Sequence, residues 1–127
     1  MKIAAYWWGG KRHVGRLLED GAELTPLALG EAGHALGALA LIDYLVEGKR
    51  LPPNAGPRLP LSAVRLDAPF PRPRRNIFCV GKNYREHAKE FAASGFDTSV
   101  TTPAEAVPEV PIIFSKMPDC VIDNGLP

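Results

Sequence analysis

A histidine and a glutamate stand three residues apart, shortly after an apolar run in the second half of the chain. The run at 77–80 ends at Gly81, and residues 85–94 have the composition of a short helix. On a helix, His87 and Glu90 occupy positions i and i+3 and share one face. A carboxylate beside an imidazole fixes the ring tautomer and favours the protonated form, which suits a general base acting on water. The same spacing is also common on solvated helix faces.

Two predicted strands frame this pair. The stretch IFCV at 77–80 is a near-continuous apolar run, which predicts a strand buried on both faces. Gly81 permits a sharp turn that places the pair at the carboxyl end of this strand. The stretch PIIFSK at 111–116 predicts a second strand, and the prolines of 97–111 predict a long, mobile or lid-like connection. Residues 117–127 are predicted to be extended, with an Asn-Gly turn near their end.

The first half of the chain predicts a separate small unit. Alternating apolar residues and turn-forming glycines indicate an antiparallel meander of strands at 2–8, 13–19 and 22–29. Apolar residues at helical spacing then predict one helix over 31–47. A helix on a three-stranded sheet makes this unit α+β.

Proline-rich segments separate this unit from the rest. Residues 51–60 contain four prolines and a glycine, which predicts a loop, and a short strand fits at 64–66. Alternating prolines and arginines at 69–75 predict a stiff, solvated connector. We therefore predict a small α+β domain at 1–69 and a second domain at 70–127.

Composition excludes several classes of protein. The chain has 127 residues, 46% of them hydrophobic and 23% charged, as in ordinary globular proteins. Its net charge of +1 is evenly spread, which argues against nucleic acid or an anionic membrane as a partner. No signal peptide or membrane-spanning run is recognisable, so we expect a cytoplasmic protein.

The cysteines and the other histidines are predicted to be structural. Cys79 and Cys120 lie far apart in apolar runs, which predicts buried, reduced thiols. The alternative is a nucleophilic cysteine. His13 falls in the expected hairpin and His34 near a helix start, where both are expected to pack.

The motifs of the second half, taken together, resemble the fumarylacetoacetate hydrolase (FAH) superfamily. The residues that carry the resemblance occur in order and with fitting spacing: Gly81, Asn83, Tyr84, His87, Glu90, Pro111, Phe114 and Lys116. The resemblance covers about residues 64–127, and residues 1–63 are similar in length to a small N-terminal domain of many bacterial members. It implies a mixed β-sandwich roll, of which 70–127 would be the first segment, and a homodimer.

The resemblance also implies an enzyme that acts on small 2-oxo acids such as acylpyruvates. Members use a divalent cation, Mg²⁺ or Mn²⁺, which chelates the substrate oxygens and stabilises an enolate. His87, paired with Glu90, would activate water for hydrolysis of a C–C bond. Lys116 would bind the substrate carboxylate or an oxyanion, with Tyr84 and Arg85 beside the substrate. Decarboxylation, hydration and isomerisation stay open as alternatives, because they use the same enolate.

One part of the family pattern is missing from this sequence. Relatives hold the metal with a Glu-x-Glu motif and an aspartate downstream of the lysine strand. This sequence has no Glu-x-Glu, and Asp119 and Asp123 do not fit the pattern. We therefore expect these 127 residues alone to lack the metal ligands and the activity. Either the chemistry belongs to a longer protein, or the chain is a degenerate relative of the family. A non-catalytic binding or assembly module and a free-thiol enzyme are the alternatives from other classes.

Overall fold

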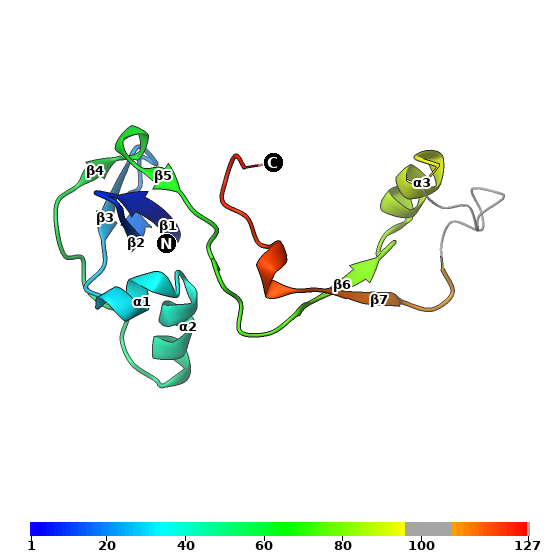
Figure 1. The fold of residues 1–127 in the computed structure, drawn as a ribbon, viewed down its shortest axis with the longest axis horizontal. Helices are drawn as coiled ribbons and strands as arrows, with labels where there is room; N and C mark the ends of the chain where they lie inside the picture. Colours follow the sequence, from blue (N-terminus) through cyan, green and yellow to red (C-terminus); the bar gives the residue numbers. More distant parts are fainter. Residues whose placement is uncertain (96–107, 127) are drawn as a thin grey trace. The chain divides into compact units, whose positions relative to one another are not determined.

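The chain forms two compact units. The computed structural model describes residues 1–95 and 108–126. The first unit comprises Met1–Arg74 and Pro118–Pro127, and the second comprises Arg75–Met117 (Figure 1). The structure contains helices and antiparallel sheets, so the predicted α+β class is confirmed. The domains predicted at 1–69 and 70–127 stay a prediction.

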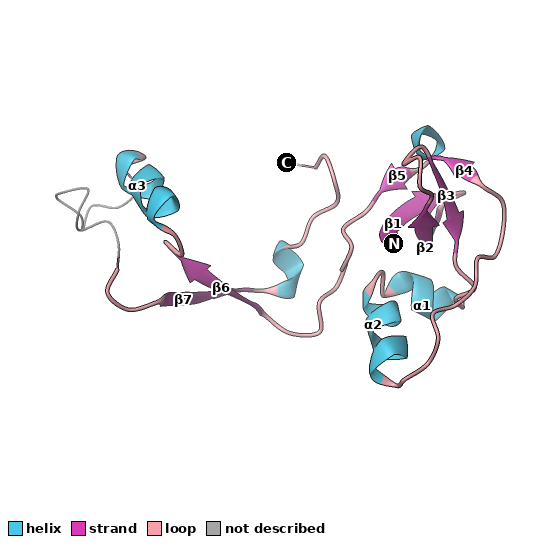
Figure 2. Ribbon diagram, turned by 180° about the vertical axis from the view of Figure 1, so that it is seen from behind, coloured by secondary structure: helices cyan, strands magenta, loops and turns pink. Residues whose placement is uncertain are grey.

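The first unit contains a five-stranded antiparallel sheet (Figure 2). Its strands, in spatial order, are β4 (Leu59–Pro60), β3 (Glu23–Pro26), β2 (Lys11–Leu17), β1 (Lys2–Trp8) and β5 (Arg65–Leu66). The hairpin between β1 and β2 turns at Gly9 and Gly10, whose φ angles are +56° and +75°. Two consecutive positive φ angles match the right-handed twist of the flanking strands. The predicted meander and the short strand near 64–66 are confirmed, while the loop predicted at 51–60 ends in β4.

The single helix predicted over 31–47 is wrong. The structure has two helices here, α1 (Glu31–Ala35) and α2 (Leu39–Val46). Gly37 between them has a φ of +64°, and a Cβ atom at this position would lie 2.5 Å from the carbonyl oxygen of Pro69. Ala38 donates its backbone N–H to the same oxygen at 2.8 Å. The chain turns here because Pro69 lies against it, a tertiary contact that helical periodicity does not reveal.

Both faces of this sheet are buried. Tyr6, Leu24 and Leu59 form one cluster, and Val14, Leu27 and Leu41 of α2 form another. Val14 lies opposite Ala5 in the β1–β2 register, so it points to the face opposite that of Tyr6. The first unit therefore contains its own core in two layers.

Two ion pairs close the edge of the sheet beside Trp7. Arg12 donates to Asp67, whose side chain is fully buried, and Arg65 donates to Asp123. Both guanidinium groups lie over the indole ring, with their carbons 4.7 and 5.4 Å from its centroid. The ion pair between Arg65 and Asp123 ties the closing segment of the chain to this unit. Burial, and then hydrogen bonding with Asp123, raise the pKa of Asp67, while hydrogen bonding with Asp67 and with Arg65 lowers the pKa of Asp123.

The second unit consists of a two-stranded sheet and one helix. Strands β6 (Ile77–Gly81) and β7 (Ile112–Lys116) pair antiparallel, and α3 (Arg85–Ala93) follows β6. The two predicted strands and the helix are confirmed. The prediction that the first strand is buried on both faces is wrong, since Phe78 is 78% exposed and Val80 48%. The apolar sequence of β6 suits a buried strand. A two-stranded sheet, however, has no second layer of structure packed on its faces to bury these side chains.

Three smaller expectations can also be compared with the structure. Both cysteines are free, as predicted, but Cys79 is only half-buried and Cys120 is exposed, so their predicted burial is wrong. The closing stretch turns at its Asn-Gly pair as predicted, but it begins with a 3₁₀ turn at Pro118–Cys120 rather than an extended segment. Most of the connection predicted at 97–111 lies outside the described residues. No helix in the described parts has the length and apolar character needed to span a bilayer.

Candidate functional site

A tight turn links β6 to α3 and begins the candidate site. Gly81 is the last residue of the strand, and Lys82 has a φ of +50°, which is uncommon for a residue other than glycine. Tyr84 precedes the helix with an extended backbone and no side-chain cap. Glu86 lies in the first turn, where a carboxylate interacts favourably with the positive end of the helix dipole. The Gly-x-Asn-Tyr sequence thus forms the change from strand to helix.

His87 lies between two aromatic neighbours on α3. Its ring centroid is 5.4 Å from that of Tyr84 and 6.5 Å from that of Phe91. These neighbours are three residues before and four residues after it, the spacing that brings side chains together along a helix. Tyr84 is 59% exposed, so this ring contact lies at the surface of the second unit. The two rings restrict the orientation of the half-buried imidazole.

Glu90 lies one helical turn after His87 but does not contact it. Within 1–95 and 108–126, no hydrogen bond or ion pair joins the two side chains, and Glu90 is exposed. The i and i+3 positions still place both residues on one face of the helix, so a rotamer change can bring them together. The catalytic dyad stays a prediction.

The strand register separates Lys116 from this turn. Lys116 pairs with Ile77 at the start of β6, whereas Gly81 at its end pairs with Ile112. Four residue steps of extended chain, about 13 Å, therefore lie between Lys116 and the start of the turn. Arg85, by contrast, is exposed in the first turn of α3, close to His87 in sequence. The hairpin does not bring Lys116 and His87 together.

A hollow of about 220 Å³ opens beside the turn. Its lining residues come from the end of β6, from the turn that follows it and from the segment before β7: Val80, Gly81, Lys82, Asn83, Pro108, Glu109, Val110 and Pro111. Asn83 belongs to the family pattern, but Glu109 was not predicted. Glu109 lies beside the hollow because β7 pairs with β6, and no local sequence pattern around residue 109 indicates this pairing.

The described residues do not fit a metal centre. No group of three or more His, Cys, Asp or Glu side chains in the described parts of the chain is arranged to hold a metal ion. His87 and Glu90 therefore have no ligand set around them here. What they can do chemically is accept, hold and release a proton.

Comparisons with known proteins support the superfamily resemblance. No protein-family model matches the chain. The chain is 42% identical over 65 residues to oxaloacetate tautomerase YisK of Bacillus subtilis (strain 168). YisK is a member of the FAH superfamily. The match covers 51% of this chain but only 18% of the relative, so the chain corresponds to a small part of that protein.

Proposed function

We propose that this chain belongs to an enzyme of the FAH superfamily that converts a small 2-oxo acid into its enol. The identity of 42% to an oxaloacetate tautomerase is the observation that supports it. In such a tautomerisation a proton leaves the carbon beside the keto group, and its electron pair forms a C=C bond. The carbonyl oxygen takes up a proton, and no C–C bond breaks. Isomerisation is thereby favoured over the hydrolysis that the motif alone suggested.

In this proposal His87 is the base that accepts the carbon-bound proton. Contacts with Tyr84 and Phe91 hold the imidazole, and Glu90 orients it after a rotamer change. Arg85 is better placed than Lys116 for the substrate carboxylate, because it begins the helix that carries the base. The superfamily resemblance implies a divalent cation, Mg²⁺ or Mn²⁺, and a homodimer for the whole protein.

Hydrolysis of an acylpyruvate is the second candidate, favoured by the His87–Glu90 spacing. A base oriented by a glutamate is suited to taking a proton from water. The resulting hydroxide attacks the distal carbonyl, and the C–C bond breaks with its electron pair passing to pyruvate as the enolate. The enolate then takes up a proton to give pyruvate and a carboxylic acid.

Product analysis on the whole protein tests these candidates. With Mg²⁺ or Mn²⁺ present, it is incubated separately with oxaloacetate, acetylpyruvate and fumarylpyruvate, and products are followed by NMR. We expect interconversion of keto and enol oxaloacetate without cleavage. Cleavage of either acylpyruvate with no effect on oxaloacetate would instead establish the hydrolase. Turnover of none of the three would favour a binding or assembly module.

Substitution of His87 tests the catalytic base. We expect His87→Gln to lower kcat by a factor of about 10² to 10⁴, the usual contribution of a general base. Lys89→Gln is the matched control, since Lys89 is exposed on the same helix. Unchanged turnover in His87→Gln would remove the histidine from the mechanism without affecting the superfamily assignment.

A further inference from the structure

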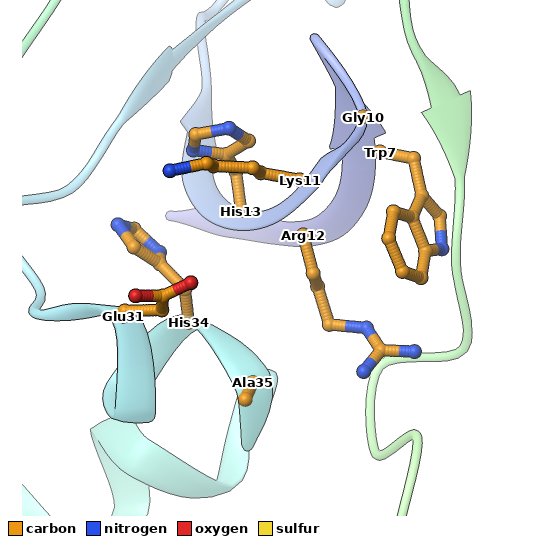
Figure 3. A pocket seen from close by; sticks show the side chains of 8 residues that line it. All are labelled: Trp7, Gly10, Lys11, Arg12, His13, Glu31, His34 and Ala35. Atoms are coloured by element: carbon orange, nitrogen blue, oxygen red, sulfur yellow. The ribbon is translucent and has the colours of Figure 1, made fainter.

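The first unit contains a pocket that the motif of the second unit does not explain. It measures about 380 Å³ and lies between the β1–β2 hairpin and α1 (Figure 3). Its lining residues are Trp7, Gly10, Lys11, Arg12, His13, Glu31, His34 and Ala35. Lys11 and His13 come from β2, and Glu31 and His34 come from α1. Two of the three histidines of the chain thus line one pocket, although each was predicted to be structural.

His34 is fixed as a neutral N–H donor. Its Nδ1 accepts the backbone N–H of Val14 at 3.0 Å. A ring nitrogen that accepts a hydrogen bond carries no proton, so the proton of the neutral ring is on Nε2. Burial, and then the neighbouring His13, lower the pKa of His34, which keeps the ring neutral.

His13 is held in place by aromatic rings rather than by hydrogen bonds. Its ring centroid is 5.6 Å from that of Tyr6 in a stacked arrangement, 5.6 Å from that of Trp8, and 5.2 Å from that of His34. Within 1–95 and 108–126, neither of its ring nitrogens makes a hydrogen bond. An oriented imidazole with free nitrogens is available to a ligand.

Lys11 provides the charge that is available in this pocket. Its side chain is exposed and makes no ion pair with any described residue, whereas the guanidinium of Arg12 is occupied by Asp67 and the ring of Trp7. Glu31 is likewise exposed and unpaired among the described residues. Figure 3 shows Lys11, His13, Glu31 and His34 grouped on one side of the pocket, with Trp7 and Arg12 on the other.

We infer that this pocket binds a small oxyanion, a carboxylate or a phosphate, through Nζ of Lys11 and the ring N–H groups of His13 and His34. Donors from two different elements can bind one oxyanion together, and the ammonium makes the strongest of these hydrogen bonds. The volume falls within the usual range for small-molecule pockets. Glu31 repels a second negative charge, so the site favours ligands of low charge. The inference does not depend on the function proposed for the second unit.

Histidine side-chain NMR on the full chain tests the inference. Pyruvate and inorganic phosphate are titrated separately at constant pH and ionic strength, with chloride as the balancing anion. We expect saturable shifts of the His13 and His34 ring nitrogens, with those of His87 at most one fifth as large. A response to only one of the two anions identifies the source of the oxyanion. No saturable shift with either anion, or an equal shift at His87, would overturn the site.

Charge substitutions then test the named residues. We expect Lys11→Gln to weaken binding by about tenfold, the size of a charge-assisted hydrogen bond. Lys49→Gln is the matched control, an exposed lysine of the same unit outside the pocket, and should change affinity less than twofold. We expect Glu31→Gln to tighten binding by about threefold, because it removes a nearby like charge at an exposed position. Equal weakening by both lysine substitutions, or weaker binding in Glu31→Gln, would overturn the assignment.

Discussion

In the first unit a five-stranded sheet buries its large apolar side chains, whereas in the second a two-stranded sheet displays them. Tyr6, Val14 and Leu24 are 0% exposed, while Phe78 and Ile113 are 78% and 66% exposed. An isolated two-stranded sheet is marginally stable at best, whereas three or more strands with a buried face can be stable alone. The residues of the proposed chemistry therefore lie in the unit that gains least from its own packing.

Amide hydrogen exchange should show the largest difference between the units. We expect the paired amides of β1 and β2 to exchange at least about 100-fold more slowly than those of β6 and β7, because protection follows local burial and contact density. The reporters are the amides that are hydrogen-bonded to the partner strand within each hairpin. Comparable protection in the two hairpins would contradict the contrast and would mean that β6 and β7 are stabilised by contacts outside their own unit.

A matched pair of truncations sharpens the same comparison. Leu24→Ala removes a fully buried side chain and should lower the free energy of unfolding of the first unit by about 2–5 kcal/mol. Phe78→Ala removes a side chain that is 78% exposed and should change the stability of the second unit by less than about 1 kcal/mol. Urea unfolding, read from the amide signals of each unit separately, measures both. A loss above about 2 kcal/mol in Phe78→Ala would show that this ring is buried in solution.

Local sequence patterns predicted the helices and strands better than they predicted the tertiary contacts and burial of these elements. The alternation of apolar residues and the turn glycines were sufficient to predict β1 and β2, because their hairpin is a local structure. The composition of residues 85–94 was sufficient to predict α3. The break between the two helices at Gly37 was missed because it depends on a contact with Pro69. The exposure of β6 was missed because an apolar sequence does not specify which part of the molecule covers it.

The candidate sites show the same limit. His87 and Glu90 could be singled out because they are close in sequence. The pocket of Lys11, His13 and His34 required α1 to be placed on β2, which the hydrogen bond from Val14 to His34 does. The separation of Lys116 from His87 required the register of two strands. Which residues share a site therefore depends on contacts between segments distant in sequence, and sequence periodicity does not predict these contacts.

The carboxyl pair of Asp67 and Asp123 should make the stability of the first unit depend on pH. This effect is smaller than those above, and we expect it to leave the second unit unchanged. Folding raises the pKa of Asp67, so this group contributes stability below the ordinary carboxyl pKa and loses it as pH rises through the raised value. Folding lowers the pKa of Asp123, so its contribution is present above the ordinary pKa and is lost as pH falls through the lowered value. Opposite shifts are what two carboxyl groups sharing one proton produce.

Carboxyl titration by NMR tests this pair. In Asp123→Asn the pKa of Asp67 should fall, since burial alone then raises it, and in Asp67→Asn the pKa of Asp123 should rise toward its ordinary value. Glu19→Gln, at an exposed position, is the control and should leave both values unchanged. Independent titration of the two groups would contradict the shared proton. A matching pH response in the amides of β6 and β7 would mean that the two units do not respond separately, because both carboxyl groups belong to the first unit alone.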